Sequence, residues 1–154
     1  MRKPPVSNLP AIVSELPSWL LTQTAMHAHR LVSAGLGTIG AHRYHYRILA
    51  ALRDVGPMSQ AALGRRSGIH LSDMVATING LVDTGYVRRT PDPADRRRNV
   101  ITLTAGGRAQ LKRLEKRVGQ IQDDLLAPLS PEERDQLKSL LARLLAYHAG
   151  GASI

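Results

Sequence analysis

The sequence predicts a mainly α-helical fold with one small β-hairpin, and three observations support this prediction. Apolar residues recur at spacings of three and four along most of the chain, which is the period of amphipathic helices. Two alternating runs, Tyr86–Thr90 and Asn99–Leu103, flank the Pro- and Asp-rich loop Pro91–Arg98, a pattern typical of two strands joined by a hairpin. Breakers such as Gly56-Pro57 separate the helical segments from one another.

Length and composition indicate one domain with a polyanionic partner. The 154 residues, of which 43% are hydrophobic, can bury one core but are too few for two, so residues 1–154 are expected to form a single domain. The net charge of +9 favours either nucleic acid or an anionic membrane surface as partner. No run approaches the roughly 18 apolar residues of a membrane span, and the N-terminus MRKPPVSNLP lacks a signal peptide's apolar core. We therefore expect a cytoplasmic protein with no membrane partner.

The first third of the chain reads as an arm followed by two helices. Residues 1–15 contain several prolines and no clear period, so the sequence leaves their order open. A first helix is expected from Ser18 to Ala34, stopping near Gly35 and Gly37. A second is expected over Ala41–Asp54, ending at the Gly56 breaker.

The next two helices have the spacing of a helix-turn-helix. Ser59 is a suitable N-cap for a short helix over Gln60–Ser67, and Gly68 then opens a turn. The helix Leu71–Thr84 that follows can be divided by face at 100° per residue. Around Ile78 lie Leu71, Met74, Val75, Leu81 and Val82, whereas Ser72, Asp73, Ala76 and Gly80 point outward, flanked by Thr77 and Asn79. An ordinary solvent-facing surface usually carries Lys and Glu; this small, polar face instead suits insertion into a DNA major groove.

The hairpin that follows this helix carries a concentration of positive charge. Its five arginines are Arg88, Arg89, Arg96, Arg97 and Arg98. A charge run is most often a solvated surface, but its position directly after a helix of this kind favours a DNA-binding wing.

Two long helices complete the chain. Thr104 is the expected N-cap of a helix whose apolar seam is Leu111, Leu114, Val118, Ile121 and Leu125. Ser130-Pro131-Glu132-Glu133 predicts a capping box before a second stripe made of Leu137, Leu140, Leu141, Leu144, Leu145 and His148. Residues 41–104 are expected to form a winged helix-turn-helix DNA-binding lobe, and neither stripe is needed to cover it. We therefore expect segments 18–37 and 105–148 to be dimerisation helices of a symmetric homodimer.

Between Tyr46 and Leu114, about half of the chain, four motifs follow one another: Ile48, Leu49 and Leu52 before Gly56, the junction Leu81…Gly85-Tyr86-Val87-Arg88-Arg89, the wing motif Asp95-Arg96-Arg97, and Leu103-Thr104…Gly107. In the order and spacing of these motifs the chain resembles the MarR (multiple antibiotic resistance regulator) family of bacterial transcription factors. The resemblance implies a winged helix-turn-helix flanked by N- and C-terminal dimerisation helices. It also implies a pseudo-palindromic double-stranded DNA operator, and release by a small ligand, often aromatic or anionic.

The resemblance also implies which residues contact DNA. Ser72, Asp73 and Thr77 become candidates for base or phosphate contact, and Arg97 for minor-groove insertion, with Asp95 orienting the loop. The outward face of the expected recognition helix carries no basic residue, unlike that of many relatives, so affinity is expected to rest on the arginines. The full candidate set is Ser59, Arg65, Arg66, Ser72, Asp73, Thr77, Arg89, Arg96, Arg97 and Arg98. Asp73 has two possible roles: its carboxylate can accept a hydrogen bond from a cytosine amino group, or it can stabilise the N-terminus of its helix through the helix dipole.

A second candidate site lies on the first helix. Trp19, Gln23, His27 and Arg30 recur at spacings of three and four, and together with Tyr46 they form the expected pocket for an aromatic or carboxylate effector. The alternative is that Trp19 packs in the dimer interface while His27 and Arg30 bond between helices. His42 and His45 are three residues apart and could both bind a metal ion, so a metal-responsive regulator is an alternative. The sequence fixes no third ligand.

The remaining signals are negative. The chain has no cysteine, which excludes disulfides and thiolate metal sites within it. The sequence shows no phosphate-cradling glycine motif and no nucleophile elbow, so we expect neither an enzyme nor a cofactor. The function predicted is a DNA-binding transcriptional regulator, specifically a repressor released by an effector. A ligand-independent architectural dimer built on the same fold is the alternative.

Overall fold

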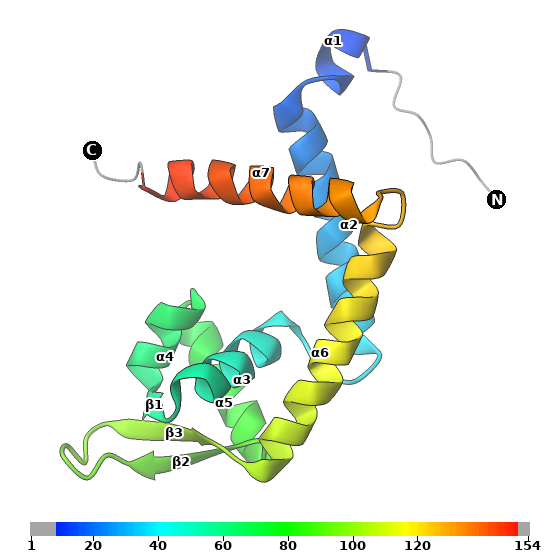
Figure 1. Ribbon diagram of the computed structural model, residues 1–154. Coiled ribbons are helices and arrows are strands. Elements are labelled where there is room, and N and C mark those ends of the chain that lie inside the picture. Colours follow the sequence, from blue (N-terminus) through cyan, green and yellow to red (C-terminus); the bar gives the residue numbers. More distant parts are fainter. Residues whose placement is uncertain (1–8, 151–154) are drawn as a thin grey trace. The chain divides into compact units, whose positions relative to one another are not determined.

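The computed structural model describes residues 9–150, which form helices and a small antiparallel sheet (Figure 1). The elements are α1 (Ala11–Ser14), α2 (Pro17–Gly37), α3 (Arg43–Val55), β1 (Met58–Ser59), α4 (Gln60–Ser67), α5 (Leu71–Asp83), β2 (Val87–Pro91), β3 (Asn99–Leu103), α6 (Ala105–Leu125) and α7 (Pro131–Gly150). They divide into two compact units, one up to Val118 and one from Gly119 onward. Within the described range, no helix combines the length and the apolar character needed to cross a bilayer.

The sheet confirms the expected hairpin and adds one strand. Strands β2 and β3 pair antiparallel from Val87 opposite Leu103 to Pro91 opposite Asn99. The added strand, β1, pairs with the other side of β3 through Met58 opposite Ile101, giving the order β1-β3-β2. A strand of two residues has no detectable period, which is why the sequence did not reveal it.

The first unit is built around one apolar core. Helices α3, α4 and α5 pack on one another, and α3 and α4 also contact β3. The fully buried side chains are Leu36, Ile48, Leu49, Leu63, Met74, Ile78, Leu81, Ile101, Leu111 and Leu114. Because these side chains come from α2 to α6, the core fixes the helix-turn-helix, the sheet and the first part of α6 together.

Helix capping follows the sequence closely. The Ser59 Oγ accepts a hydrogen bond from the Ala62 N–H at 3.2 Å, and Gly68 ends α4 in the left-handed conformation at φ 62°. At the start of α6 the Thr104 Oγ1 accepts from the Gly107 N–H at 3.0 Å. Before α7, Ser130 and Glu133 bond reciprocally, at 2.9 and 3.2 Å, which confirms the expected capping box.

The beginning of the chain is more helical than expected. Of the expected arm 1–15, residues 1–8 lie outside the described residues, and Ala11–Ser14 form α1. Helix α2 continues past Ala34 and ends at Gly37, one of the two glycines near which the sequence placed its end. A glycine within a helix costs about 1 kcal/mol, but Gly35 and Leu36 are buried here. The Arg117 guanidinium also donates to the Gly35 carbonyl at 2.9 Å, so packing outweighs propensity.

The expected buried face of α5 was partly wrong. Leu71 is 73% exposed and Val75 40% exposed, whereas Thr77, expected at the edge of the outward face, is 6% exposed. The buried face runs through Met74, Thr77, Ile78 and Leu81, with the usual spacing of three and four. Thr77 can be buried because its hydroxyl donates to the Asp73 carbonyl at 2.7 Å. Compared with the expected orientation, the helix is rotated so that Thr77 faces the core, and Leu71 and Val75 remain exposed.

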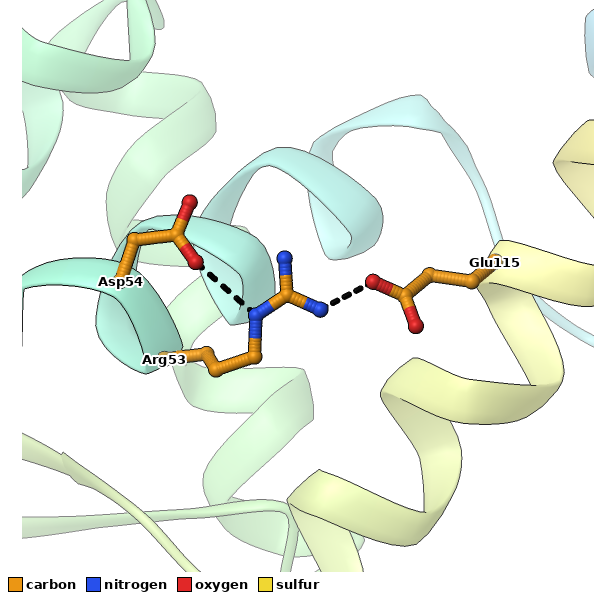
Figure 2. Close-up of polar contacts among 3 residues, drawn as sticks. All are labelled: Arg53, Asp54 and Glu115. Carbon is orange, nitrogen blue, oxygen red and sulfur yellow. Dashed lines mark hydrogen bonds and ion pairs between the residues drawn. The ribbon is translucent and has the colours of Figure 1, made fainter.

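An ion-pair cluster links α3 to α6 within the first unit (Figure 2). The Arg53 guanidinium lies between the Asp54 carboxylate, at 2.9 Å, and the Glu115 carboxylate. Hydrogen bonds to Asp54 and to Glu115 raise the pKa of Arg53 above its usual value. All three side chains are substantially exposed, so the cluster orients the two helices and adds little stability.

The start of α6 supplies a test of the fold. A Cβ added at Gly107 would overlap the Tyr86 carbonyl oxygen and lie 2.6 Å from the Leu103 Cδ1, so backbone would have to move. We expect Gly107→Ala to lower the free energy of unfolding by about 1–3 kcal/mol or more. At Gly106 the nearest atom, the Gly85 carbonyl oxygen, is 3.6 Å away, an ordinary contact. Gly106→Ala, the matched control, should be neutral or stabilising by up to about 1 kcal/mol in urea unfolding. Equal effects of the two substitutions would contradict this account of the junction.

Candidate nucleic-acid interface

The helix-turn-helix is formed by α4 and α5. Gly68 turns the chain with a positive φ, and the buried side chain of Ile69 anchors the turn to the core. Helices α4 and α5 contact one another, and a Cβ added at Gly64 on α4 would lie 3.8 Å from the Met74 Cε in the first turn of α5. The two helices are therefore packed directly on one another, and the exposed face of α5 is held in a fixed position.

Strand β2 is tied to α5 by one hydrogen bond between side chains. The Arg89 guanidinium donates to the Asn79 Oδ1 at 2.6 Å. Arg89 is half-buried, and its bond to Asn79 makes it a link between hairpin and helix rather than a free cation. This link orients the wing relative to α5.

The tip of the hairpin is organised by two aspartates. Asp92 Oδ1 accepts from the Ala94 N–H at 2.9 Å, and Asp95 Oδ1 accepts from the Arg97 N–H at 3.1 Å. The other oxygen of Asp95 lies 3.6 Å from the Arg98 Nε. Arg96, Arg97 and Arg98 remain exposed. The acidic residues thus shape the loop, and the basic residues occupy its surface.

An open hollow of about 390 Å³ lies between α4, the start of α5 and the wing. Its lining residues are Ser59, Gln60, Ala61, Arg65, Leu71, Arg97, Arg98 and Asn99. Three arginines line this hollow together with Gln60 and Ala61 of the N-terminal turn of α4, where backbone N–H groups carry partial positive charge. The arrangement is suited to the phosphate groups of a nucleic acid.

The structure brings together four of the sequence-predicted DNA residues at this hollow: Ser59, Arg65, Arg97 and Arg98. Arg66, Arg96 and Ser72 are exposed without lining it, and Arg89 bonds to Asn79. Thr77 is 6% exposed, its hydroxyl donates to the Asp73 carbonyl within α5, and what remains accessible of it lines a different hollow from the one that holds the arginines. Leu71 also lines the hollow. It was not among the candidate DNA-binding residues predicted from the sequence, because an apolar residue on the apolar face of a helix is expected to be buried in the core.

A second hollow, of about 460 Å³, lies between α2, α3 and α5. Its lining residues are His29, Ser33, His42, Arg43, Tyr44, Asp73, Ala76 and Thr77. The Arg43 guanidinium lies 3.2 Å from the His29 Nδ1, donates to the Tyr44 hydroxyl at 3.1 Å, and lies 4.9 Å from the Tyr44 ring centre. The lining therefore offers a cation, an imidazole and an aromatic ring from α2 and α3, and it also includes residues of α5. Asp73 lies on this side of α5 and not at the hollow lined by arginines.

The face of α2 that was predicted to bind an effector is partly assembled. Arg30 and His27 lie within hydrogen-bonding distance, at 3.1 Å, and Trp19 and Gln23 are half-buried on the same helix. Tyr46 is half-buried on α3. The residues that line the second hollow are different ones.

The paired histidines at the start of α3 are close to one another. The ring centroids of His42 and His45 lie 3.8 Å apart, and the His45 Nδ1 accepts a hydrogen bond from the backbone N–H of His42 at 3.4 Å. Burial, followed by the charge of the nearby His42, lowers the pKa of His45 to about 4. Burial and the Arg43 charge lower the pKa of His42. In the part of the chain that the structure describes, no three His, Cys, Asp or Glu side chains are grouped so as to hold a metal ion.

Fold and site together define the class of the protein. Two packed helices, a three-stranded sheet with a protruding hairpin, and arginines gathered beside the second helix make a winged helix-turn-helix regulator.

Comparison with known proteins identifies the family. A family model described as MarR family matches residues 37–98. The repressor NicR of Pseudomonas putida is 29% identical over 146 residues, which cover 92% of this chain and 89% of NicR. Two further curated relatives are matched over 60% of their own length.

Solved structures agree with this assignment. A probable transcriptional regulator from Pseudomonas aeruginosa superimposes with a TM-score of 0.74 at 30% identity, covering 85% of this chain and 98% of that one. BpsR of Bordetella bronchiseptica, whose DNA binding is regulated by 6-hydroxynicotinic acid, gives 0.75 at 26% identity, covering 88% and 97%. The chain belongs to the MarR family of transcription regulators, which are not enzymes.

The wing provides a test of the interface. Asp95→Ala removes a negative charge, yet we expect it to weaken binding to a random-sequence duplex about 5-fold, the usual contribution of one hydrogen bond. The reason is that the Arg97 backbone and the Arg98 side chain lose their common partner. Asp124→Ala makes the same change of net charge on α6 and should leave binding unchanged, as measured by fluorescence anisotropy. Tighter binding by Asp95→Ala would show that charge, and not loop geometry, decides affinity.

Proposed function

We propose that this chain is a homodimeric, sequence-specific DNA-binding regulator of transcription, acting as a repressor that a small aromatic or carboxylate-bearing effector releases. The observation that carries the proposal is the hollow that places Arg65, Arg97 and Arg98 beside the start of α5. Helix α5 enters the major groove of double-stranded DNA, and the wing follows the backbone into the adjacent minor groove. Such a protein acts on the chromosome, and we therefore propose the cytoplasm as its location.

The dimer is proposed from apolar side chains that the described residues leave uncovered. On α2 the exposed ones include Leu20, Leu21, Met26 and Leu31, and on α7 Leu140, Leu141, Leu144, Leu145 and Tyr147. Helix α7 has no buried residue at all. Apolar stripes of this kind usually mark an interaction surface, and segments 18–37 and 105–148 are proposed to pack against a second copy. Two-fold symmetry then calls for a pseudo-palindromic operator.

The effector is proposed to bind in the second hollow. Arg43 offers a bidentate partner for a carboxylate, and Tyr44 offers an aromatic face. The lining also includes Ala76 and Thr77 of α5, so a ligand there would contact the helix proposed to read DNA. BpsR responds to an aromatic carboxylate of this kind. A ligand can act only through different affinities for the free and DNA-bound forms, typically about 5- to 150-fold of coupling.

The α2 face with Trp19, Gln23, His27 and Arg30, together with Tyr46, is the alternative effector position. The contact between Arg30 and His27 supports it, because the pair presents a hydrogen-bonded cation on an exposed helix. The other possible role of this α2 face is to pack in the dimer interface, in which case it would not bind an effector.

The dimer and its operator are tested together. Leu144→Asp should convert a micromolar dimer into a monomer in sedimentation, whereas Ser139→Asp, the same new charge on the opposite side of α7, should not. On duplexes selected from random sequence, the wild-type protein should prefer two half-sites about 34 Å apart over one. Selected sites should bind at least about 10³-fold more tightly than random DNA. Less than about tenfold preference would instead show an architectural DNA-binding dimer.

The effector position is tested with a panel of hydroxylated aromatic carboxylates that includes 6-hydroxynicotinate. An active compound should lower the DNA affinity of the wild-type protein at least about 5-fold. Arg43→Ala should bind DNA normally without the compound and should lose this response. Arg30→Ala is the matched control, with the same truncation on α2. Loss of the response in Arg30→Ala alone would instead place the effector on the α2 face that carries Trp19 and Arg30. If no compound of the panel lowers DNA affinity, the proposed class of effector is wrong.

A further inference from the structure

Helix α5 presents an apolar strip where a DNA-reading helix would be expected to present polar side chains. Leu71, its first residue, is 73% exposed, and Val75, one turn later on the same side, is 40% exposed. Ala76 is also exposed. The sequence of α5 contains neither Lys nor Arg, so the helix cannot itself supply the arginine contacts that commonly read guanine.

The polar groups of α5 are largely engaged elsewhere. The Asn79 Oδ1 accepts from Arg89, and the bidentate reading of adenine needs that oxygen as well as the amide nitrogen. The Thr77 hydroxyl is buried and bonded to the Asp73 carbonyl. Asp73 itself lines the hollow shared with α2 and α3. On the side of the wing, the outer surface of α5 is therefore mainly Leu71, Ser72 and Val75.

The surroundings of Leu71 define its partner. Leu71 lines the same hollow as Arg65, Arg97 and Arg98, so the occupant of this surface must carry dense negative charge close to an apolar group. An apolar protein or a lipid chain would leave the guanidinium groups without counter-charges. Double-stranded DNA offers both features, since phosphates border the major groove and the thymine C5-methyl group projects into it.

We propose that Leu71 and Val75 are specificity-determining residues that read thymine methyl groups in the major groove. The inference rests on the proposed DNA binding and deepens it: the arginines hold the backbone, and the apolar strip selects thymine at the base pairs facing the start of α5. Ser72, beside the strip, is left to bond a neighbouring base edge or phosphate.

The test removes single methyl groups from the DNA. After duplexes have been selected with the wild-type homodimer, each thymine of a half-site is replaced in turn by deoxyuridine, which keeps base pairing and lacks only the methyl group. At one or two positions we expect affinity to fall about 4-fold, the effect of burying one methyl group. Leu71→Ala or Val75→Ala should weaken binding to the thymine duplex and abolish the response to deoxyuridine at its own position.

Two controls separate this coupling from general weakening. Arg66→Ala removes a cation from α4, and it should weaken binding while keeping the full response to deoxyuridine. Val55→Ala truncates an exposed apolar residue at the end of α3 and should change neither quantity. Full deoxyuridine sensitivity in both Leu71→Ala and Val75→Ala, or no sensitive thymine at all, overturns the inference while leaving the proposed function intact. Failure to select any sequence would overturn the proposed function and the inference with it.

Discussion

The close fit at the start of α6 is the constraint on which the rest of the first unit depends. Thr104 caps α6 and donates its hydroxyl hydrogen to the Gly85 carbonyl at 2.6 Å, while Gly107 lies directly under the Tyr86 carbonyl. Gly85, with φ 77°, forms the turn between α5 and β2. One small contact region therefore joins the end of the recognition helix, both hairpin strands and the long helix. The direction of the wing follows from this junction and from the bond between Arg89 and Asn79.

Much of the fold could be predicted because local chemistry determines it. The caps at Ser59 and Thr104, the left-handed glycine at Gly68 and the alternation in the hairpin each act over a few residues. The position of the arginines beside α5 also followed from order along the chain. Where the neighbours of a residue in the sequence determine its conformation, the secondary structure could be predicted from the sequence.

The differences arise where tertiary packing decides. Gly35 remains helical where it is buried, and Thr77 can face the core because its hydroxyl donates to a carbonyl of its own helix. A helical wheel ranks residues by polarity alone, so it placed Thr77 outside and Leu71 inside. A helical wheel also treats one helix at a time, so it could group the candidate effector residues of α2 but not the lining of the second hollow, which comes from α2, α3 and α5.

The two hollows divide α5 between them. The hollow beside the wing takes Leu71, and the other takes Asp73, Ala76 and Thr77, so no residue of α5 lines both. A mutation at Leu71 or Val75 leaves the lining of the second hollow unaltered, and a mutation at Ala76 leaves that of the first unaltered. Under the proposed function, substitutions on one flank of α5 can therefore change the DNA target without changing effector binding, and substitutions on the other flank can do the reverse. An engineer who wishes to rewire the regulator can likewise mutate each flank in a separate library.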